Sequence, residues 1–168
     1  MPYKHTFPIT AKLGLTIYVM LSSNKANSAV QKEHGLFVLQ YNTVTDRWIK
    51  KSPLPAVVDT YGVAAAAAVN GSLFLVGGMK KLCLKYNNAE DVWTKLSQTC
   101  NVHCFGALVC VRGKLLLLGG STDAYNTDAS KSDTVEEFDL QANKWSVLDW
   151  KLPKPLKMHS AFLMYIKP

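Results

Sequence analysis

The ligand types that bind zinc lie closest together at Cys100, His103 and Cys104. Thiolates and imidazoles suit a structural zinc ion, but such an ion needs four ligands, and no second pair follows at the spacing of a zinc site. We therefore expect no metal and no cofactor. The cysteines are expected to be free in a reducing compartment, with Cys83 and Cys110 as small apolar residues of strands.

Catalytic groups at useful spacings are also scarce. Glu136 and Glu137 are adjacent carboxylates, a residue type that can carry out general acid–base catalysis. In a strand, however, neighbouring side chains point to opposite faces, so the two carboxylates cannot act together. The sequence contains no Ser-His-Asp spacing, phosphate-binding loop or His-Glu-x-x-His motif. We therefore expect no catalytic residue and no enzyme activity.

Three of the four histidines share one position of a repeating pattern. His103 lies 17 residues before the end of an apolar run, His5 and His159 take the equivalent position near the two termini, and Tyr61 takes it in between. Equivalent residues of a ring of repeats could face a common channel, where they would form local hydrogen bonds, contact a ligand or bind a metal. Local hydrogen bonding and ligand contact are the two interpretations that the pattern favours over metal binding.

The repeating pattern is defined by aromatic pairs and glycine doublets. Three pairs have the same seven-residue spacing: Tyr41 and Trp48, Tyr86 and Trp93, and Phe138 and Trp145. Two of the pairs are preceded by an apolar run that ends in a doublet, Gly77-Gly78 or Gly119-Gly120. The two doublets are 42 residues apart, and a repeat of this length largely determines the fold.

Each unit is predicted to contain four short strands. The first strands are rich in small and β-branched residues, as in 62–69 and 105–111; the second is the apolar run, the third carries the first aromatic residue, and the fourth begins at the tryptophan. Asn70-Gly71 and Arg112-Gly113 suit two-residue hairpin turns. Asp46, Asp91 and Asn143 precede the tryptophans by two residues, where a tight turn favours a residue that tolerates positive φ.

The five alanines at 64–68 need a separate explanation, because alanine favours helices. Gly62 before them and Asn70-Gly71 after them leave too few residues for a stable helix. Small side chains suit the innermost strand of a propeller blade, which runs beside the crowded central axis. Four antiparallel strands per unit at this period predict the blades of a β-propeller.

The arrangement resembles the Kelch family, in which four hydrophobic residues and a glycine doublet are followed by a tyrosine and a tryptophan separated by six residues. The resemblance covers nearly the whole chain and implies an all-β fold, a partial Kelch propeller of about three four-stranded blades. The units are expected at about 5–55, 61–98 and 103–152, with a closing strand at 159–166. In the first unit Leu21-Ser22 replaces the glycines, and Pro8 makes strand pairing doubtful.

Three blades cannot close a ring, because propellers have about four to eight. We therefore expect the C-terminal half of a larger propeller, with further blades upstream. The resemblance also implies that one face, built from the loops entering each first strand and leaving each second strand, binds a partner peptide. The residues expected to contact a partner there are Tyr61, His103, His159, Lys80, Lys81 and Tyr125. The doublets and aromatic pairs are expected to be structural.

Many proteins that resemble this chain carry BTB and BACK domains ahead of the propeller and act as substrate adaptors of cullin-based ubiquitin ligases. The resemblance therefore implies a cytoplasmic or nuclear protein-interaction module that binds a protein substrate or peptide, with cullin contacted only through upstream domains. A cytoskeletal or scaffolding Kelch protein is the alternative. A galactose-oxidase-type enzyme would also use such blades, but it needs a copper site.

Charge and hydropathy restrict the remaining classes of function, such as nucleic-acid binding and membrane insertion. The net charge is +7, but the lysines are scattered, which favours a solvated surface or an acidic partner over nucleic acid. The apolar stretches 62–78 and 105–120 are each interrupted by a polar turn, so we expect neither to span a membrane. Residues 13–21 loosely resemble the core of a signal peptide, but they also fit the second strand of the first unit.

Overall fold

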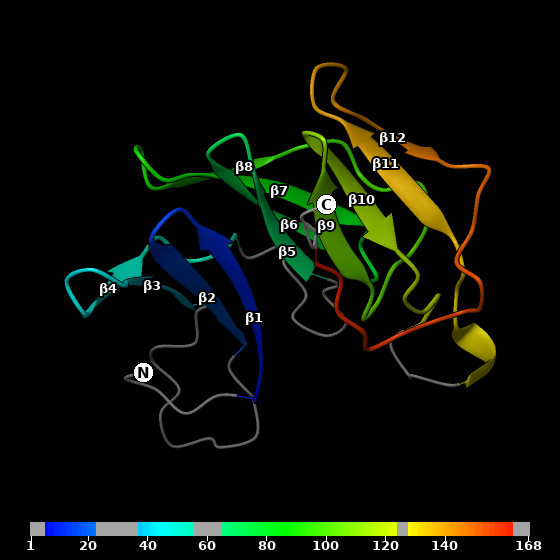
Figure 1. The fold of residues 1–168 in the computed structure, drawn as a ribbon, viewed down its shortest axis with the longest axis horizontal. Coiled ribbons are helices and arrows are strands. Elements are labelled where there is room, and N and C mark those ends of the chain that lie inside the picture. Colours follow the sequence, from blue (N-terminus) through cyan, green and yellow to red (C-terminus); the bar gives the residue numbers. More distant parts are fainter. Residues whose placement is uncertain (1–5, 23–36, 56–64, 124–127, 163–168) are drawn as a thin grey trace, which may run out of the picture.

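The computed structural model describes residues 6–22, 37–55, 65–123 and 128–162 of the 168-residue chain. In this part of the chain there is no α-helix, and so none that could cross a membrane. Twelve strands form three four-stranded antiparallel sheets (Figure 1). Blade 1 contains β1 (Thr6–Leu13), β2 (Thr16–Ser22), β3 (Phe37–Asn42) and β4 (Arg47–Lys51); blade 2 contains β5 (Ala65–Val69), β6 (Ser72–Gly77), β7 (Leu82–Asn87) and β8 (Val92–Lys95); blade 3 contains β9 (Ala107–Val111), β10 (Lys114–Leu118), β11 (Val135–Asp139) and β12 (Lys144–Val147). A 3-10 turn, η1 (Asp128–Ser130), lies between β10 and β11.

The three sheets are arranged radially. Within each sheet the strands follow chain order, so every connection is a hairpin. The first strand of blade 2, β5, contacts the first strands of the other two blades, β1 and β9. The sheets therefore fan out from a shared inner row of strands (Figure 1), as the blades of a propeller do. This arrangement confirms the all-β fold of Kelch-like blades that the sequence predicts.

The hairpin turns have the conformation that their residues indicate. Val69 pairs with Ser72 across Asn70 and Gly71, whose φ values are 47° and 75°. The same pairing holds between β9 and β10, where Arg112 and Gly113 have φ values of 51° and 78°. Two consecutive residues at positive φ match the twist of the flanking strands. The turns before the tryptophans follow the expectation too, since φ is positive at Asp46, Asp91 and Asn143.

The alanine segment is extended where the structure describes it. Ala65 to Val69 form β5, the inner strand of blade 2, while residues 62–64 lie outside the described part. Ala66 and Ala68 pack against the cluster shared with blade 1, and Ala65 and Ala67 against the cluster shared with blade 3. Both faces of this strand are therefore next to a neighbouring blade, which leaves space only for small side chains.

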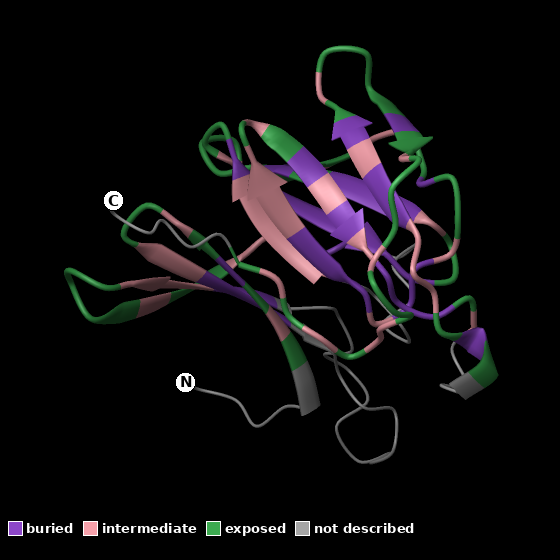
Figure 2. Ribbon diagram, turned by 45° about the vertical axis from the view of Figure 1, so that its right-hand side comes forward, coloured by how far each residue is buried: buried purple, intermediate pink, exposed green. Residues whose placement is uncertain are grey.

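The core consists mainly of two layers between blades. Tyr18, Met20 and Val38 of blade 1 pack against residues that include Leu73, Leu75 and Tyr86 of blade 2. The opposite face of blade 2 packs against blade 3 through Phe74, Val76 and Cys83 on one side and Leu115, Leu117, Phe138 and Trp145 on the other. In blade 2, β6 is buried on both faces (Figure 2), which explains why its apolar run does not alternate with polar residues.

The aromatic pairs are cross-strand neighbours on the third and fourth strand of each blade. Their ring centroids lie 4.9 Å apart for Tyr41 and Trp48, 4.8 Å for Tyr86 and Trp93, and 4.9 Å for Phe138 and Trp145. Their burial rises along the chain. Tyr41 and Trp48 are half-buried, Trp93 is half-buried beside a buried Tyr86, and Phe138 and Trp145 are both buried.

Two expectations for the ends of the chain need correction. The doubt about pairing in the first strand is wrong, because β1 pairs with β2 continuously from Ile9 to Leu13, and a register shift between Thr6 and Ile9 accommodates Pro8. Residues 159–162 do not form part of a closing strand. The backbone just before them bonds to loops of blade 3 instead, as in the bond from Met158 N to Phe105 O at 2.8 Å. Residues 163–166 lie outside the described part.

Candidate functional site

The connections of the blades lie at two opposite ends of the strands. We call one end the turn face; it contains the tight hairpin turns between first and second strands and between third and fourth strands. We call the other end the loop face; it contains the segments 78–81, 99–106 and 119–123, which leave a second strand or enter a first strand. Loops held by a rigid scaffold are the usual place for recognition, so the loop face is the candidate site.

The second glycine doublet is required by close packing in the loop face. Gly119 and Gly120 have φ values of 57° and 98°, which disfavour any other residue. A Cβ atom on Gly119 would lie 2.7 Å from the Leu156 carbonyl oxygen, and one on Gly120 would lie 2.8 Å from the Cys104 carbonyl oxygen. The doublet therefore lets two other segments approach the end of β10.

Backbone hydrogen bonds join these segments into one layer. Gly78 N donates to His103 O at 3.1 Å, which ties the loop leaving β6 to the loop entering β9. Cys104 and Ser121 exchange two bonds, of 2.9 and 2.6 Å, and Gly120 N donates to Leu156 O at 2.7 Å. The loop entering β9 is thus held between the loops that leave β6 and β10, and the layer has a defined shape without a ligand.

His103 lies inside this layer. Its side chain has 0% exposure, Nδ1 is 2.5 Å from the Gly119 carbonyl oxygen, and Nε2 is 3.1 Å from Glu136 Oε1. The expectation that His103 contacts a partner directly is therefore wrong, because no part of the ring reaches the surface. Its role in local hydrogen bonding, the other interpretation of its position in the repeat, agrees with this geometry.

Glu136 is the acceptor around which the loop is organised. Its side chain is fully buried and accepts from Cys100 N at 2.8 Å, from Asn101 N at 2.7 Å and from Asn101 Nδ2 at 2.9 Å, in addition to His103. Burial alone would raise the pKa of Glu136, but the bonds from His103 and from the Cys100 and Asn101 amides together lower the pKa below its usual value.

The sequence analysis missed this pair, although one signal for it exists. Glu136 precedes Phe138 by two residues in β11, so the two side chains share the buried face of the strand. A carboxylate on a buried face requires a partner. Glu137 points the other way and bonds to Lys114 Nζ at 2.6 Å, which agrees with the expectation that the two carboxylates do not act together.

The remaining residues expected to bind a partner lie in different surroundings. Lys80 is exposed, and Lys81 is half-buried with its Nζ 3.2 Å from Cys100 O, next to the loop that Glu136 holds. His159 lies apart from them, half-buried beside the central axis. Tyr61 and Tyr125 lie outside the described residues. The structure therefore brings Lys81 and His103 close to Cys100 in the segment 99–106, whereas His159 lies near the other end of that segment, beside Gly106.

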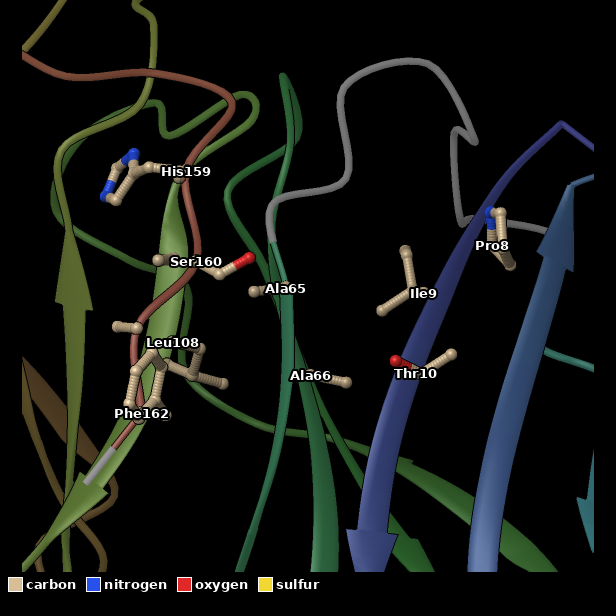
Figure 3. Close-up of a pocket in the computed structure, with 12 residues that line it drawn as sticks. Pro8, Ile9, Thr10, Ala65, Ala66, Leu108, His159, Ser160 and Phe162 are labelled. Carbon is tan, nitrogen blue, oxygen red and sulfur yellow. The ribbon is translucent and has the colours of Figure 1, made fainter. Parts of the chain in front are cut away.

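A cavity of about 380 Å³ lies at the loop-face end of the three inner strands. It is lined by residues of β1, β5 and β9, by Gly106 and by the C-terminal segment (Figure 3); those drawn with labels are Pro8, Ile9, Thr10, Ala65, Ala66, Leu108, His159, Ser160 and Phe162. Burial lowers the pKa of His159, although the nearby Leu118 backbone favours the charged form. Neither ring nitrogen meets ordinary hydrogen-bond geometry with a described residue.

Metal and acid–base chemistry find little support in this geometry. Among the described residues, no group of three or more His, Cys, Asp or Glu side chains could hold a metal ion. In the Cys100–His103–Cys104 cluster, both ring nitrogens of His103 already face oxygen atoms of the protein. Cys100 is exposed whereas Cys104 is buried, so the two thiols do not share an environment.

Comparison with known proteins finds a known motif in the third blade. A Kelch motif model matches residues 104–149, which include the four strands of blade 3. The chain carries Kelch repeats. Kelch-like protein 21 of Rattus norvegicus is 31% identical over 97 residues, which are 58% of this chain and 15% of that protein. Kelch-like protein 30 of Homo sapiens is 28% identical over 141 residues, or 83% of this chain and 23% of that protein.

Kelch-like protein 40 of Xenopus laevis is 33% identical over 114 residues, which are 64% of this chain and 17% of that protein. The chain thus spans between 15% and 23% of the length of these three relatives. The three blades share the aromatic pairs, and blades 2 and 3 also share the glycine doublet.

Proposed function

We propose that this chain is a protein-interaction module whose loop face binds a protein substrate or peptide. The observation that carries the proposal is the layer of backbone bonds that joins the segments 78–81, 99–106 and 119–123. Segments held in this way lose little conformational freedom when a partner binds, and low ordering cost favours affinity.

The shape and charge of the loop face support the proposal. The axial cavity lies beside the layer, and concave sites of this kind accept side chains of a partner. Lys80 is exposed on the loop face, and the half-buried Lys81 lies beside it. A face with this balance of charge suits a partner with acidic side chains.

A role in catalysis is not part of the proposal. The buried ionisable residues of the loop face, His103 and Glu136, bond to each other and to the backbone, so neither has a free atom to offer a substrate. We infer that the chain contributes to recognition and to no chemical step.

We further propose that the module is part of the substrate-binding propeller of a cullin-based ubiquitin ligase adaptor, in the cytoplasm or the nucleus. The support is the similarity to Kelch-like proteins together with the family resemblance described above. Contact with a cullin would be made by BTB and BACK domains outside these blades.

A cross-linking experiment tests the recognition face. A photo-cross-linking amino acid is placed at position 80 on the loop face or, as a matched control, at position 44 in the turn between β3 and β4, where Val44 is 70% exposed. The proposal predicts that one protein is captured from position 80 and not from position 44. Capture from position 44 alone, or equally from both, would contradict it.

The captured protein then separates the two kinds of Kelch module. Cullin-dependent ubiquitylation of that protein in cells supports the adaptor. Co-sedimentation of the captured complex with actin filaments, without cullin-dependent ubiquitylation, supports the cytoskeletal scaffold.

A further inference from the structure

The hydrogen bonds around His103 determine how many protons its ring carries. The Gly119 carbonyl oxygen, which faces Nδ1, can only accept a hydrogen bond. The Glu136 carboxylate, which faces Nε2, accepts three other bonds from Cys100 N, Asn101 N and Asn101 Nδ2. A carboxyl group surrounded by N–H donors is an ionised acceptor. An imidazolium, in which both ring nitrogens donate, satisfies both of these acceptors.

We propose that His103 and Glu136 form a buried proton-dependent clasp, which fixes the loop-face segment 99–103 while His103 is charged and releases it when the ring loses a proton. The clasp deepens the proposed function, because that segment lies in the face assigned to partner recognition. Its physical basis does not depend on a partner, so it can be tested on the chain alone.

The clasp joins three parts of the third blade. Glu136 belongs to β11, Gly119 directly follows β10, and His103 belongs to the loop that enters β9. Cys100 and Asn101 are held in the loop by the same carboxylate. If His103 loses a proton, one nitrogen presents a lone pair to an oxygen atom that also lacks a proton. Two acceptors then face each other in a buried site, and the loop must move to relieve the contact.

The charged and titratable groups around the clasp come from four elements. The loop that contains His103 supplies Cys100 and Cys104; burial, and then the negative charge of Glu136, raise the pKa of the Cys100 thiol. The loop after β6 supplies Lys81, whose Nζ bonds to Cys100 O. From β11, Glu137 faces away toward Lys114 on β10. The doublet at the end of β10 supplies no ionisable group.

This environment leaves Glu136 as the counter-ion of His103. Lys81 interacts with the exposed side of the loop, and the other carboxylate of β11 is directed to the opposite face of the sheet. Loss of a proton from His103 therefore removes the positive partner of a buried carboxylate.

Amide hydrogen exchange of the full chain tests the clasp. The rates at Cys100 and Asn101 are measured from about pH 5 to about pH 9, corrected for intrinsic exchange, and compared with the β6 amide of Leu75. We expect protection at Cys100 and Asn101 to fall about tenfold or more as the pH rises, while protection at Leu75 stays constant. Constant protection at all three amides would overturn the proposal.

Two variants separate the clasp from a general effect of pH. His103→Gln removes the titrating group, so the pH dependence at Cys100 and Asn101 should disappear. His159→Gln removes the histidine beside the axial cavity, which has no bond to Glu136, and should leave the pH dependence unchanged. A His103→Gln chain that keeps the pH dependence of the unmodified protein would overturn the proposal.

A measurement on the unmodified chain avoids the risk that His103→Gln does not fold. Imidazole nitrogen chemical shifts report whether each ring nitrogen carries a proton. At pH values where Cys100 and Asn101 are protected, both nitrogens of His103 should be protonated. One unprotonated nitrogen under those conditions would show that no imidazolium holds the loop, whatever the loop face binds.

Discussion

The backbone N–H of Ser97 donates to Asn143 Oδ1 at 3.1 Å, across the boundary between blades 2 and 3. The same bond joins blades 1 and 2, where Ser52 N donates to Asp91 Oδ1 at 3.0 Å. In both cases the acceptor is the residue at positive φ two positions before a tryptophan. One residue thus shapes the turn of its own blade and binds the segment that follows the outer strand of the preceding blade.

Substitutions at Asn143 should separate these two roles. Asn143→Ala loses the acceptor and keeps a Cβ atom at a φ of 49°, a conformation that alanine tolerates less well than asparagine, so the free energy of unfolding should fall by about 1–2 kcal/mol. Asn143→Gly also loses the acceptor, but it removes the Cβ atom from this conformation and should cost about 1 kcal/mol. Chemical denaturation measures both values, and Asn143→Asp, which keeps the acceptor, is the control. A chain in which alanine is tolerated as well as aspartate would rule out the bond across the boundary.

The glycine doublet makes a second prediction about stability. Gly119→Ala should cost about 2–4 kcal/mol, because the added Cβ atom meets the Leu156 carbonyl oxygen at a backbone conformation that disfavours alanine. Gly113→Ala is the matched control, since Gly113 has a similar positive φ but no atom within 4 Å of the added Cβ. It should cost about 1 kcal/mol. Equal losses for the two variants would mean that backbone strain alone explains the doublet.

The two tryptophans of blades 2 and 3 should differ in their contribution to stability. Trp145 is 3% exposed and packs between blades, so Trp145→Ala should lower the free energy of unfolding by about 3–5 kcal/mol. Trp93 is half-buried, and Trp93→Ala should cost clearly less. Denaturant titration provides the comparison, with Trp145→Phe as a control that keeps an aromatic ring. A larger loss at Trp93 than at Trp145 would contradict the packing described here.

The adjacent glutamates of β11 should respond differently to neutralisation. Glu136→Gln leaves His103 without its counter-ion in a buried site, so the chain should lose about 3 kcal/mol of stability. Glu137→Gln alters an exposed pair with Lys114 and should leave stability nearly unchanged. If unfolding experiments show similar effects for both variants, the alternation of faces along β11 is not as described.

Lowering the pH should remove the contribution of Glu136 to the stability of the folded chain. Its pKa is lower in the folded chain than its usual value of 4.5, so the folded state binds its proton less readily than the unfolded state. The stability from Glu136 is then fully present above about pH 4.5 and is lost as the pH falls through the lowered pKa. The melting temperature of Glu136→Gln should therefore fall less steeply below that pH than that of the unmodified chain. Parallel profiles would show that Glu136 does not contribute.

Local signals in the sequence were sufficient to predict the strands and their turns. Asn70-Gly71 and Arg112-Gly113 specify two-residue turns, and the apolar run before Gly77 can be buried on both faces only between two other layers. The clasp could not be found in the same way. His103 and Glu136 are 33 residues apart, and their contact depends on how the loop entering β9 packs on β11.

Residues at the same position of the repeat do not have the same environment in the loop face, and the reason is physical. His103 and His159 occupy the same position of the pattern, but His103 is enclosed by a doublet and a buried carboxylate, whereas His159 lies beside the axial cavity. The environment of a side chain in the loop face is determined by loops of different length and composition. Those loops are the part of each unit that does not repeat.

The measurement that tests the central claim most directly is the binding footprint of the captured partner on the full chain. Amide exchange with and without that partner should show new protection in the loop face, at 79–81, 99–101 and 121–123, and no change in the turns at 43–46, 70–71 and 112–113. New protection confined to those turns would contradict the claim that the clasped loops form the recognition surface.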